Sequence, residues 1–303
     1  VLSEEAIAYA GLDWEVVKWP VVATDMQGDK PETAETDEYV AVVRRSDNKI
    51  LGIVGPNYEP VQNWDAFKFL DSLAGPENLV RYHTAGSLAG GKRIWLLAEI
   101  MGLTIEPIPG DITQPYLLLS NGHDGKHELQ VLWTSVRVVC QNTLNLALGQ
   151  AKADKKFSVR HTGDPKAKLE QARQILGMAT KKGEKYGAIA NYLAQQQMGD
   201  QVFASFLEEL VPDPELPIKA FRAEATRAKI KELYETGAGS DIPGVLGTRW
   251  GALQAVTAFT SHFRQTRGAG DDAEKAREKR LESVWFGTGD ALNQKAMDLL
   301  VTA

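Results

Sequence analysis

The sequence predicts an α+β protein: a twisted antiparallel β-sheet of hairpins with a long crossing helix, followed by a helical C-terminal half. The first half holds short segments rich in β-branched and aromatic residues, separated by glycine, proline and polar turns. From Pro165 onward the apolar residues follow helical spacing. The composition, 43% hydrophobic and 24% charged, is that of a globular protein. We expect a β-rich core over residues 1–164 and a helical region packed on it over residues 165–303.

The first strands surround an acidic segment. Residues 14–24 (WEVVKWPVVAT) are apolar and β-branched, and Pro20 marks an edge or a bulge. Residues 25–38 are acidic and are interpreted as a linker. Residues 39–45 and 50–54 are then expected to pair as a hairpin around the polar loop Ser-Asp-Asn-Lys.

A helix and a second hairpin follow. Asn63 is a suitable cap for a helix over residues 64–73, in which apolar residues recur every three positions and form one buried face. Residues 80–88 and 92–100 are expected to form a hairpin, because the Ala-Gly-Gly turn between them tolerates the positive φ angles of a tight turn.

The segment from Tyr116 to Leu148 is the most informative part of the chain. It contains a polar turn over residues 121–127 and an alternating strand over residues 129–140. At Asn142 and Thr143 the apolar period changes from two to about 3.6. We therefore expect either residue to cap a helix that follows the strand without a linker.

The C-terminal half is expected to consist of helices, apart from the loops and a glycine-rich segment over residues 237–247. The expected helices cover about residues 165–198 (one long helix or two abutting ones), 201–210, 218–235, 248–263, 274–284 and 290–301.

Several classes of protein are excluded by composition. No apolar run approaches the roughly 20 residues of a membrane helix. The N-terminus lacks the basic start and apolar core of a secretory signal. Cys140 is the single cysteine, which excludes an internal disulfide and fits a reducing cytoplasm. We expect a cytoplasmic protein with no membrane contact, and a natural chain that begins before the first residue given, which is not methionine.

The charge is unevenly distributed. The chain carries a net charge of −6, and residues 1–40 hold ten acids and two bases. Residues 152–185 hold ten bases and four acids. A local basic stripe of this kind is what phosphate binding needs, although a solvated helix face would have the same composition.

The histidines and the cysteine are the candidates for chemistry. His123 and Asp124 lie in the predicted turn, and with His161 and Cys140 they would form the site of a nuclease or hydrolase. The alternative is structural: turn residues are explained by backbone geometry, and a strand cysteine is commonly buried. His127 has no fourth ligand nearby in the sequence, so we expect no metal and no cofactor.

Four basic residues of the predicted hairpins are candidates for phosphate contacts. Lys92 and Arg93 follow the glycine turn, and Lys126 lies in the other turn, so the three can edge one groove. Arg137 is flanked by Val136 and Val138, and must find either a buried carboxylate or a phosphate.

A phosphate-binding P-loop is excluded. Gly86, Gly91 and Lys92 have the required spacing, but Arg93 stands where the loop needs serine or threonine, and a strand follows instead of a helix.

Aromatic residues give a second set of candidates. Tyr58, Trp95 and Trp133 are suited to stacking on nucleobases, although packing in the core is the commoner use of such side chains.

Four strings in the chain are similar to a known family. LGIVGPNYEPVQNWDAF, YHTAGSLAGGKRIWLLAEI, NGHDGKHELQVLWTSVRVVCQNTLNLAL and GTRWGALQAVTAF resemble the phage/plasmid-like protein family, a domain of unknown function, over nearly the whole chain. The resemblance implies a mobile-element setting. The order of hairpin strands, long helix and basic stripe also resembles the single-strand annealing recombinases of the RecT, Red-beta and Rad type. That resemblance implies an ATP-independent, phage-borne protein that forms rings or filaments on single-stranded DNA.

We therefore expect a homo-oligomeric protein that binds or anneals single-stranded DNA without catalysing a reaction. Two alternatives remain: the enzyme described above, and a protein-binding module that acts on a host factor through its acidic N-terminal segment. The expected DNA contacts are Lys92, Arg93, Lys126, Arg137, Lys152, Lys155, Lys156, Arg160, Lys166 and Lys168, with Tyr58, Trp95 and Trp133 for stacking.

Overall fold

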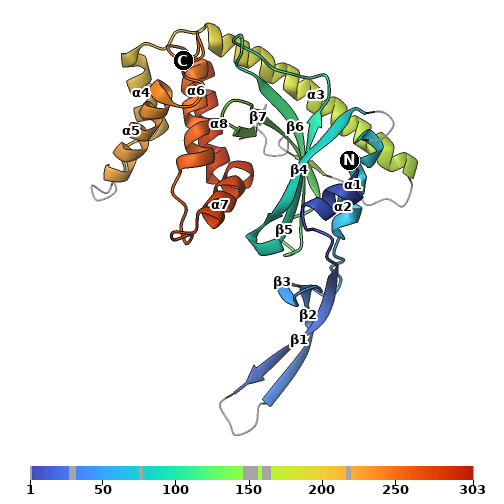
Figure 1. Ribbon diagram of the computed structural model, residues 1–303. Coiled ribbons are helices and arrows are strands. Elements are labelled where there is room, and N and C mark those ends of the chain that lie inside the picture. Colours follow the sequence, from blue (N-terminus) through green and yellow to red (C-terminus); the bar gives the residue numbers. More distant parts are fainter. Residues whose placement is uncertain are drawn as a thin grey trace. The chain divides into compact units, whose positions relative to one another are not determined.

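The computed structural model describes residues 2–26, 32–74, 78–145, 156–158, 165–215 and 220–302, and the side chains among them except those at 145, 156–158 and 165–169. The chain forms two compact units. Unit 1 comprises Val1–Met101, Leu117–Val131 and Lys156–Leu176, and unit 2 comprises Gly102–Tyr116, Leu132–Lys155 and Gly177–Ala303. The expected α+β class is confirmed, because the strands concentrate in the first half and most helices follow (Figure 1).

A three-stranded sheet in unit 1 has the order β1-β2-β3. Strand β1 (Val16–Asp25) pairs antiparallel with β2 (Glu32–Arg44), and the register shifts at Pro20, as the sequence predicts. The prediction of an acidic linker over residues 25–38 is wrong, since β2 begins at Glu32. The side chains of residues 32–39 face solvent on both sides of the strand. Their carboxylates therefore stay hydrated and do not oppose strand formation.

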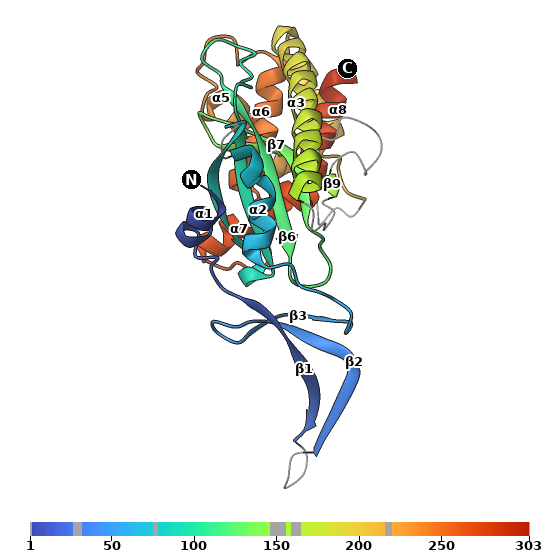
Figure 2. The ribbon, with the colours of Figure 1, turned by 90° about the vertical axis from the view of Figure 1, so that its right-hand side faces the viewer.

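The core of unit 1 forms where local patterns predicted it. Strand β3 (Lys49–Val54) joins β2 through the expected polar loop. Helix α2 (Asn63–Ala74) buries one apolar face, which confirms the predicted helix. Helix α1 (Ser3–Tyr9) lies against α2, as Figure 2 shows, and both contact strand β4 (Val80–Leu88).

The second sheet has six strands in the order β4-β5-β6-β7-β8, with β9 paired to β7. The β4–β5 pair confirms the predicted hairpin, in which Gly90 and Gly91 have φ angles of 67° and 96°. The other bounds are η1 (Ala89–Gly91), β5 (Arg93–Ile100), β6 (Thr113–Gly122), β7 (Gln130–Arg137), β8 (Asn142–Asn145) and β9 (Lys156–Ser158).

The predicted helix beginning at Asn142 or Thr143 is wrong. The chain turns at residues 138–141, and β8 returns antiparallel to β7 with Arg137 opposite Asn142. The Asn142 side chain donates to the carbonyl of Gln254 (3.1 Å) and the hydroxyl of Thr257 (3.2 Å) instead of capping a helix. A partner more than a hundred residues away therefore overrides the local signal.

Helices make up most of unit 2. The first of them, α3 (Pro165–Gln195), starts in unit 1. Helix α6 (Arg249–Ala258) is almost wholly buried and contacts α5 (Ala220–Thr236) and α8 (Thr288–Thr302). The others are α4 (Asp200–Leu210), the π-helix η4 (Phe259–Phe263) and α7 (Ala273–Phe286). None of the described helices has both the length and the apolar character needed to cross a bilayer.

Candidate nucleic-acid interface

The structure divides the predicted contact residues into exposed, buried and undescribed groups. Lys92 and Lys126 are exposed, and Tyr58 and Trp95 are partly buried. Arg93, Trp133 and Arg137 are buried. Lys152, Lys155 and Arg160 lie outside the described residues, and the backbone but not the side chain is described for Lys156, Lys166 and Lys168.

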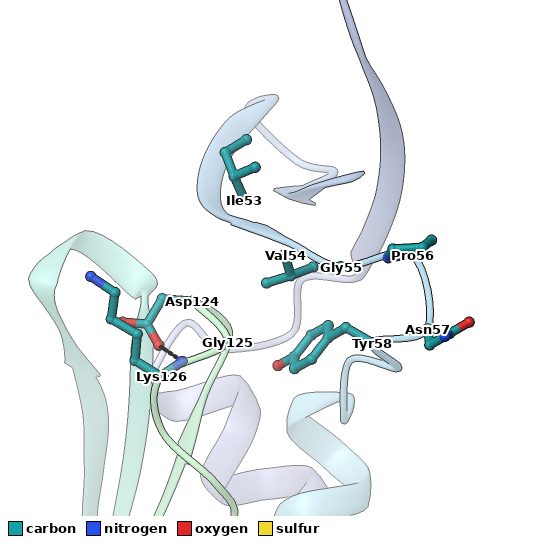
Figure 3. Close-up of a pocket in the computed structure, with 9 residues that line it drawn as sticks. All are labelled: Ile53, Val54, Gly55, Pro56, Asn57, Tyr58, Asp124, Gly125 and Lys126. Atoms are coloured by element: carbon teal, nitrogen blue, oxygen red, sulfur yellow. Dashed lines mark hydrogen bonds between the residues drawn. The ribbon is translucent and has the colours of Figure 1, made fainter. Parts of the chain in front are cut away.

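Tyr58 and Lys126 line the same surface groove in unit 1. One wall is formed by residues 53–58, which are the end of β3 and the start of the segment that leads to α2, and the other by the β6–β7 turn at residues 124–126. Figure 3 shows the ring of Tyr58 with its hydroxyl directed toward that turn. The groove has a volume of about 340 Å³, within the range of ligand sites, which starts at about 300 Å³.

Two glycines allow the walls to approach each other. A Cβ atom on Gly125 would lie 2.5 Å from Cγ1 of Val54, and Gly125 has a φ of 74°. A Cβ atom on Gly52 would lie 2.6 Å from Cα of Asp124. Real Cβ contacts are longer than this, so both positions need glycine for the turn to rest on β3.

The Asp124 carboxylate in the groove wall is held ionised. Burial alone would raise the pKa of Asp124, but the backbone N–H of Lys126 and the imidazole of His127 outweigh it and lower that pKa. Oδ1 of Asp124 accepts from Lys126 N at 3.0 Å and lies 3.1 Å from Nδ1 of His127. Burial, and then the charge of Asp124, raise the pKa of Tyr58, so the phenol stays protonated.

Lys92 and Lys49 belong to the same region of unit 1. The backbone N–H of His123 donates to the carbonyl of Lys92 at 2.8 Å, which joins the β4–β5 turn to the β6–β7 turn. The ammonium of Lys49 lies against Gly90, where an added Cβ would collide with Nζ. Sequence reasoning missed Lys49, because only the fold brings its hairpin to the glycine turn.

Arg137 forms the buried ion pair that the sequence left open. Its Nε donates to Oδ1 of Asp111 at 2.6 Å and its Nη2 to Oδ2 at 2.8 Å. The remaining N–H groups donate to the carbonyls of Ala238 (3.2 Å) and Gly239 (3.1 Å) and to Sγ of Cys140 (3.8 Å). Asp111 also accepts from Nε1 of Trp250 at 2.7 Å. With 3% of its surface exposed, Arg137 has no group left to offer a phosphate.

Trp133 and Trp95 pack within the protein. Trp133 is 1% exposed, and its ring meets Tyr186 edge to face with centroids 5.3 Å apart. Trp95 lies over Gly86, where a Cβ would come within 3.0 Å of its ring. Tyr58 is therefore the aromatic candidate among these three that lines the groove.

The described residues of the enzyme alternative, His123, Asp124 and Cys140, make structural contacts. His123 is fully buried, with Nε2 2.9 Å from Oδ1 of Asn63 and its ring against Trp14. Burial lowers the pKa of His123 to about 4, so the ring is neutral. Burial raises the pKa of the Cys140 thiol, which opposes formation of a thiolate.

His161 lies outside the described residues. Within the described ranges, no cluster of three His, Cys, Asp or Glu side chains is placed to hold a metal ion. Asp124 and His127 do contact each other, but both belong to the β6–β7 turn.

The comparisons with known proteins identify a family and no activity. Residues 50–285 match a family model described as a domain of unknown function, DUF932. A search of curated proteins and a search of solved structures each found no match. The expected membership in a domain of unknown function is thereby confirmed, and the phage setting and the recombinase resemblance stay predictions.

Proposed function

We propose, for a chain that belongs to the DUF932 family, that the protein binds single-stranded DNA in the groove between residues 53–58 and 124–126. The observation that supports this most is the convergence of Tyr58 and Lys126 on one groove. A flat ring and a cation that line one groove suit a nucleotide, which combines an aromatic base with a phosphate.

Further cations lie around the same turns. The exposed Lys92 and Lys49 flank the glycine turn of the β4–β5 hairpin. The hydrogen bond from His123 N–H to the carbonyl of Lys92 connects this turn to the β6–β7 turn, which forms one wall of the groove. Backbone phosphates give affinity without sequence preference, so we expect binding to weaken with salt by about 0.7 in log K per log salt for each phosphate contacted. The basic run at residues 152–185 supplies a further set of cations in the sequence.

The buried residues are removed from the proposed set of DNA contacts. Phosphate contact by Arg137 would leave the Asp111 carboxylate unpaired in the core, which costs several kcal/mol. Arg93 and Trp133 are also buried. The proposed contacts are Tyr58, Lys92 and Lys126, with Lys49 added and Lys152, Lys155, Lys156, Arg160, Lys166 and Lys168 retained.

In its more specific form, the proposal is that a phage- or plasmid-borne homo-oligomer anneals single-stranded DNA in the cytoplasm. A single stacking side chain and several backbone contacts would leave bases exposed for pairing, which annealing requires. The arrangement that resembles the annealing recombinases supports a ring or filament. The scheme requires neither a nucleotide cofactor such as ATP nor a metal ion.

A second candidate function comes from the outer part of the β1–β2 hairpin. Its residues 18–26 and 32–39 are exposed on both faces and include five acids, one base and the exposed Trp19, Met26 and Tyr39. Acidic and apolar groups together favour a protein partner over DNA. Removing this part of the hairpin would abolish binding to a host factor and leave DNA affinity unchanged.

The proposed function is tested by titrating a fluorescent single-stranded oligonucleotide with the protein at low and moderate salt. We expect binding at low salt that weakens as salt rises, with no requirement for ATP or magnesium. Absence of binding at low salt, or affinity independent of salt, would refute the proposal.

A further inference from the structure

The groove in unit 1 contains a carboxylate that phosphate binding does not explain. Asp124 and Lys126 line it from the β6–β7 turn, and Tyr58 lines it from the opposite wall. The Asp124 side chain is 15% exposed, so a ligand in the groove can reach it. A phosphate would be repelled by this charge. The carboxylate therefore either serves the turn alone or contacts another part of a nucleotide.

The turn uses only one of the two carboxylate oxygens. Oδ1 of Asp124 accepts from the backbone N–H of Lys126 at 3.0 Å, the bond drawn in Figure 3, and lies 3.1 Å from Nδ1 of His127. Oδ2 accepts no hydrogen bond from any residue that the structure describes. An asparagine oxygen would serve the turn as well, because asparagine and aspartate form the same kind of turn. The turn alone therefore explains neither the charge nor the second oxygen.

The carboxylate is a permanent acceptor at neutral pH. Burial raises the pKa of Asp124, but the hydrogen bonds from Lys126 N–H and His127, together with the charges of His127 and Arg93, outweigh it and lower that pKa. An ionised carboxylate can only accept hydrogen bonds.

The other polar side chains of the groove are less suited to accept from a ligand. The Tyr58 hydroxyl donates its proton to the carbonyl of Gly122 at 3.1 Å, and the Lys126 ammonium is a donor only. Figure 3 shows the Asn57 side chain directed away from the β6–β7 turn. Oδ2 of Asp124 is therefore the strongest acceptor that these side chains offer to a ligand.

The Watson–Crick edges of the bases differ in how well they suit an ionised oxygen. Guanine places two donors side by side, N1–H and N2–H. Adenine and cytosine each place an amino group next to a ring nitrogen that accepts, and thymine places its N–H between two carbonyls. Because a carboxylate is attracted by donors and repelled by acceptors, guanine is the base that fits it best.

We propose that Asp124 gives the groove a preference for guanine in single-stranded DNA. The base stacks on Tyr58, Oδ2 of Asp124 accepts from the guanine edge, and Lys126 contacts a phosphate. The inference rests on the proposed function and adds a base preference to it, because phosphate contacts carry no sequence information. Each copy of the chain holds one base in this way, so the neighbouring bases stay free to pair. A free guanine nucleotide offers the same edge and ring, and the experiment separates it from a strand.

The experiment compares single-stranded oligonucleotides of equal length built from repeats of TTG, TTA or TT-inosine. Inosine differs from guanine only in lacking the N2 amino group, and adenine is a purine that stacks similarly. Fluorescence anisotropy with the whole protein should show about tenfold tighter binding of the TTG repeat than of the TTA repeat. The inosine repeat should lie between them, because it keeps N1–H.

Asp124→Asn tests the residue itself. The asparagine oxygen still accepts from Lys126 N–H, while its amide nitrogen puts a donor where the free oxygen was. The ratio of TTG to TTA affinities should fall to one or below, even if all affinities rise because a negative charge is lost. Asp65→Asn removes the same charge from the exposed surface of α2 and should keep the wild-type ratio. A purely structural role of Asp124 would change all affinities by one factor and leave the ratio unaltered.

Failure of this inference and failure of the proposed function give different results. Salt-dependent binding with equal affinity for the three repeats, or a guanine preference that persists in Asp124→Asn, would overturn the base preference and leave DNA binding intact. Absence of binding to all three repeats would refute both. Displacement of the TTG repeat by an equal concentration of deoxyguanosine monophosphate would refute a strand as the source of the guanine. If Asp124→Asn does not fold, the guanine and inosine repeats on the wild-type protein decide.

Discussion

The hydroxyl of Tyr58 donates a hydrogen bond to the backbone carbonyl of Gly122 at 3.1 Å. This bond connects the loop after β3 to the end of β6 and holds the aromatic ring at the groove. The ring is therefore positioned before any ligand arrives, which reduces the entropy lost on binding.

Replacing Tyr58 should separate its stacking from its hydrogen bond. Tyr58→Phe keeps the ring, so we expect oligonucleotide affinity close to wild type and a loss of about 1 kcal/mol in the free energy of unfolding. Tyr58→Ala removes the ring and should weaken binding by about 1–3 kcal/mol. Fluorescence anisotropy and urea denaturation measure the two effects. Trp64→Ala, which removes an exposed ring from α2, is the control and should leave affinity unchanged.

Gly125 should be required for the groove. Gly125→Ala places a Cβ 2.5 Å from Val54 at a residue with a φ of 74°, so the turn must move away from β3. We expect a loss of about 1 kcal/mol or more in unfolding free energy together with weaker oligonucleotide binding. Gly11→Ala is the matched control, because Gly11 has a φ of 62° but a Cβ there meets no atom within 4 Å, and the residue does not line the groove. Equal behaviour of the two variants would count against the close approach.

Arg137 should matter for stability and not for DNA affinity. Arg137→Ala leaves the buried Asp111 carboxylate without its partner, and such losses cost about 3–5 kcal/mol. Chemical denaturation measures this directly. Arg137→Ala/Asp111→Ala should recover part of the loss, because no unpaired charge remains. A variant Arg137→Ala that keeps its stability but loses DNA affinity would return Arg137 to the contact set.

His123 should make stability depend on pH. The folded state protonates this ring only near pH 4, whereas an unfolded histidine does so near its ordinary pKa of 6.5. As pH falls from 6.5 to 4 the unfolded chain takes up the proton first, so stability decreases through that window, by about 3 kcal/mol in total. Urea titrations at several pH values measure the slope. His123→Gln should flatten the slope between pH 4 and 6.5.

The sequence predicted what local patterns determine. The helix at Asn63 and the hairpin at Gly90 follow from capping and turn chemistry, and both are present. Asn142 was assigned to a helix because the local period changed there, but its side chain binds Gln254, which no local pattern reveals.

The candidate site was predictable only in its parts. Tyr58 and Lys126 were identified by residue type, but their meeting depends on the contacts of Gly52 and Gly125 with distant segments. Lys49 was missed for the same reason.

The most direct test of the account reverses the charges beside the groove. Lys92→Glu/Lys126→Glu should weaken binding of a single-stranded oligonucleotide at least tenfold at low salt and should reduce the salt slope by about 1.4 in log units. Lys68→Glu, at an exposed lysine of α2, is the control and should stay close to wild type. Equal affinity and an unchanged slope in the doubly reversed variant, with its fold intact, would contradict the proposed interface.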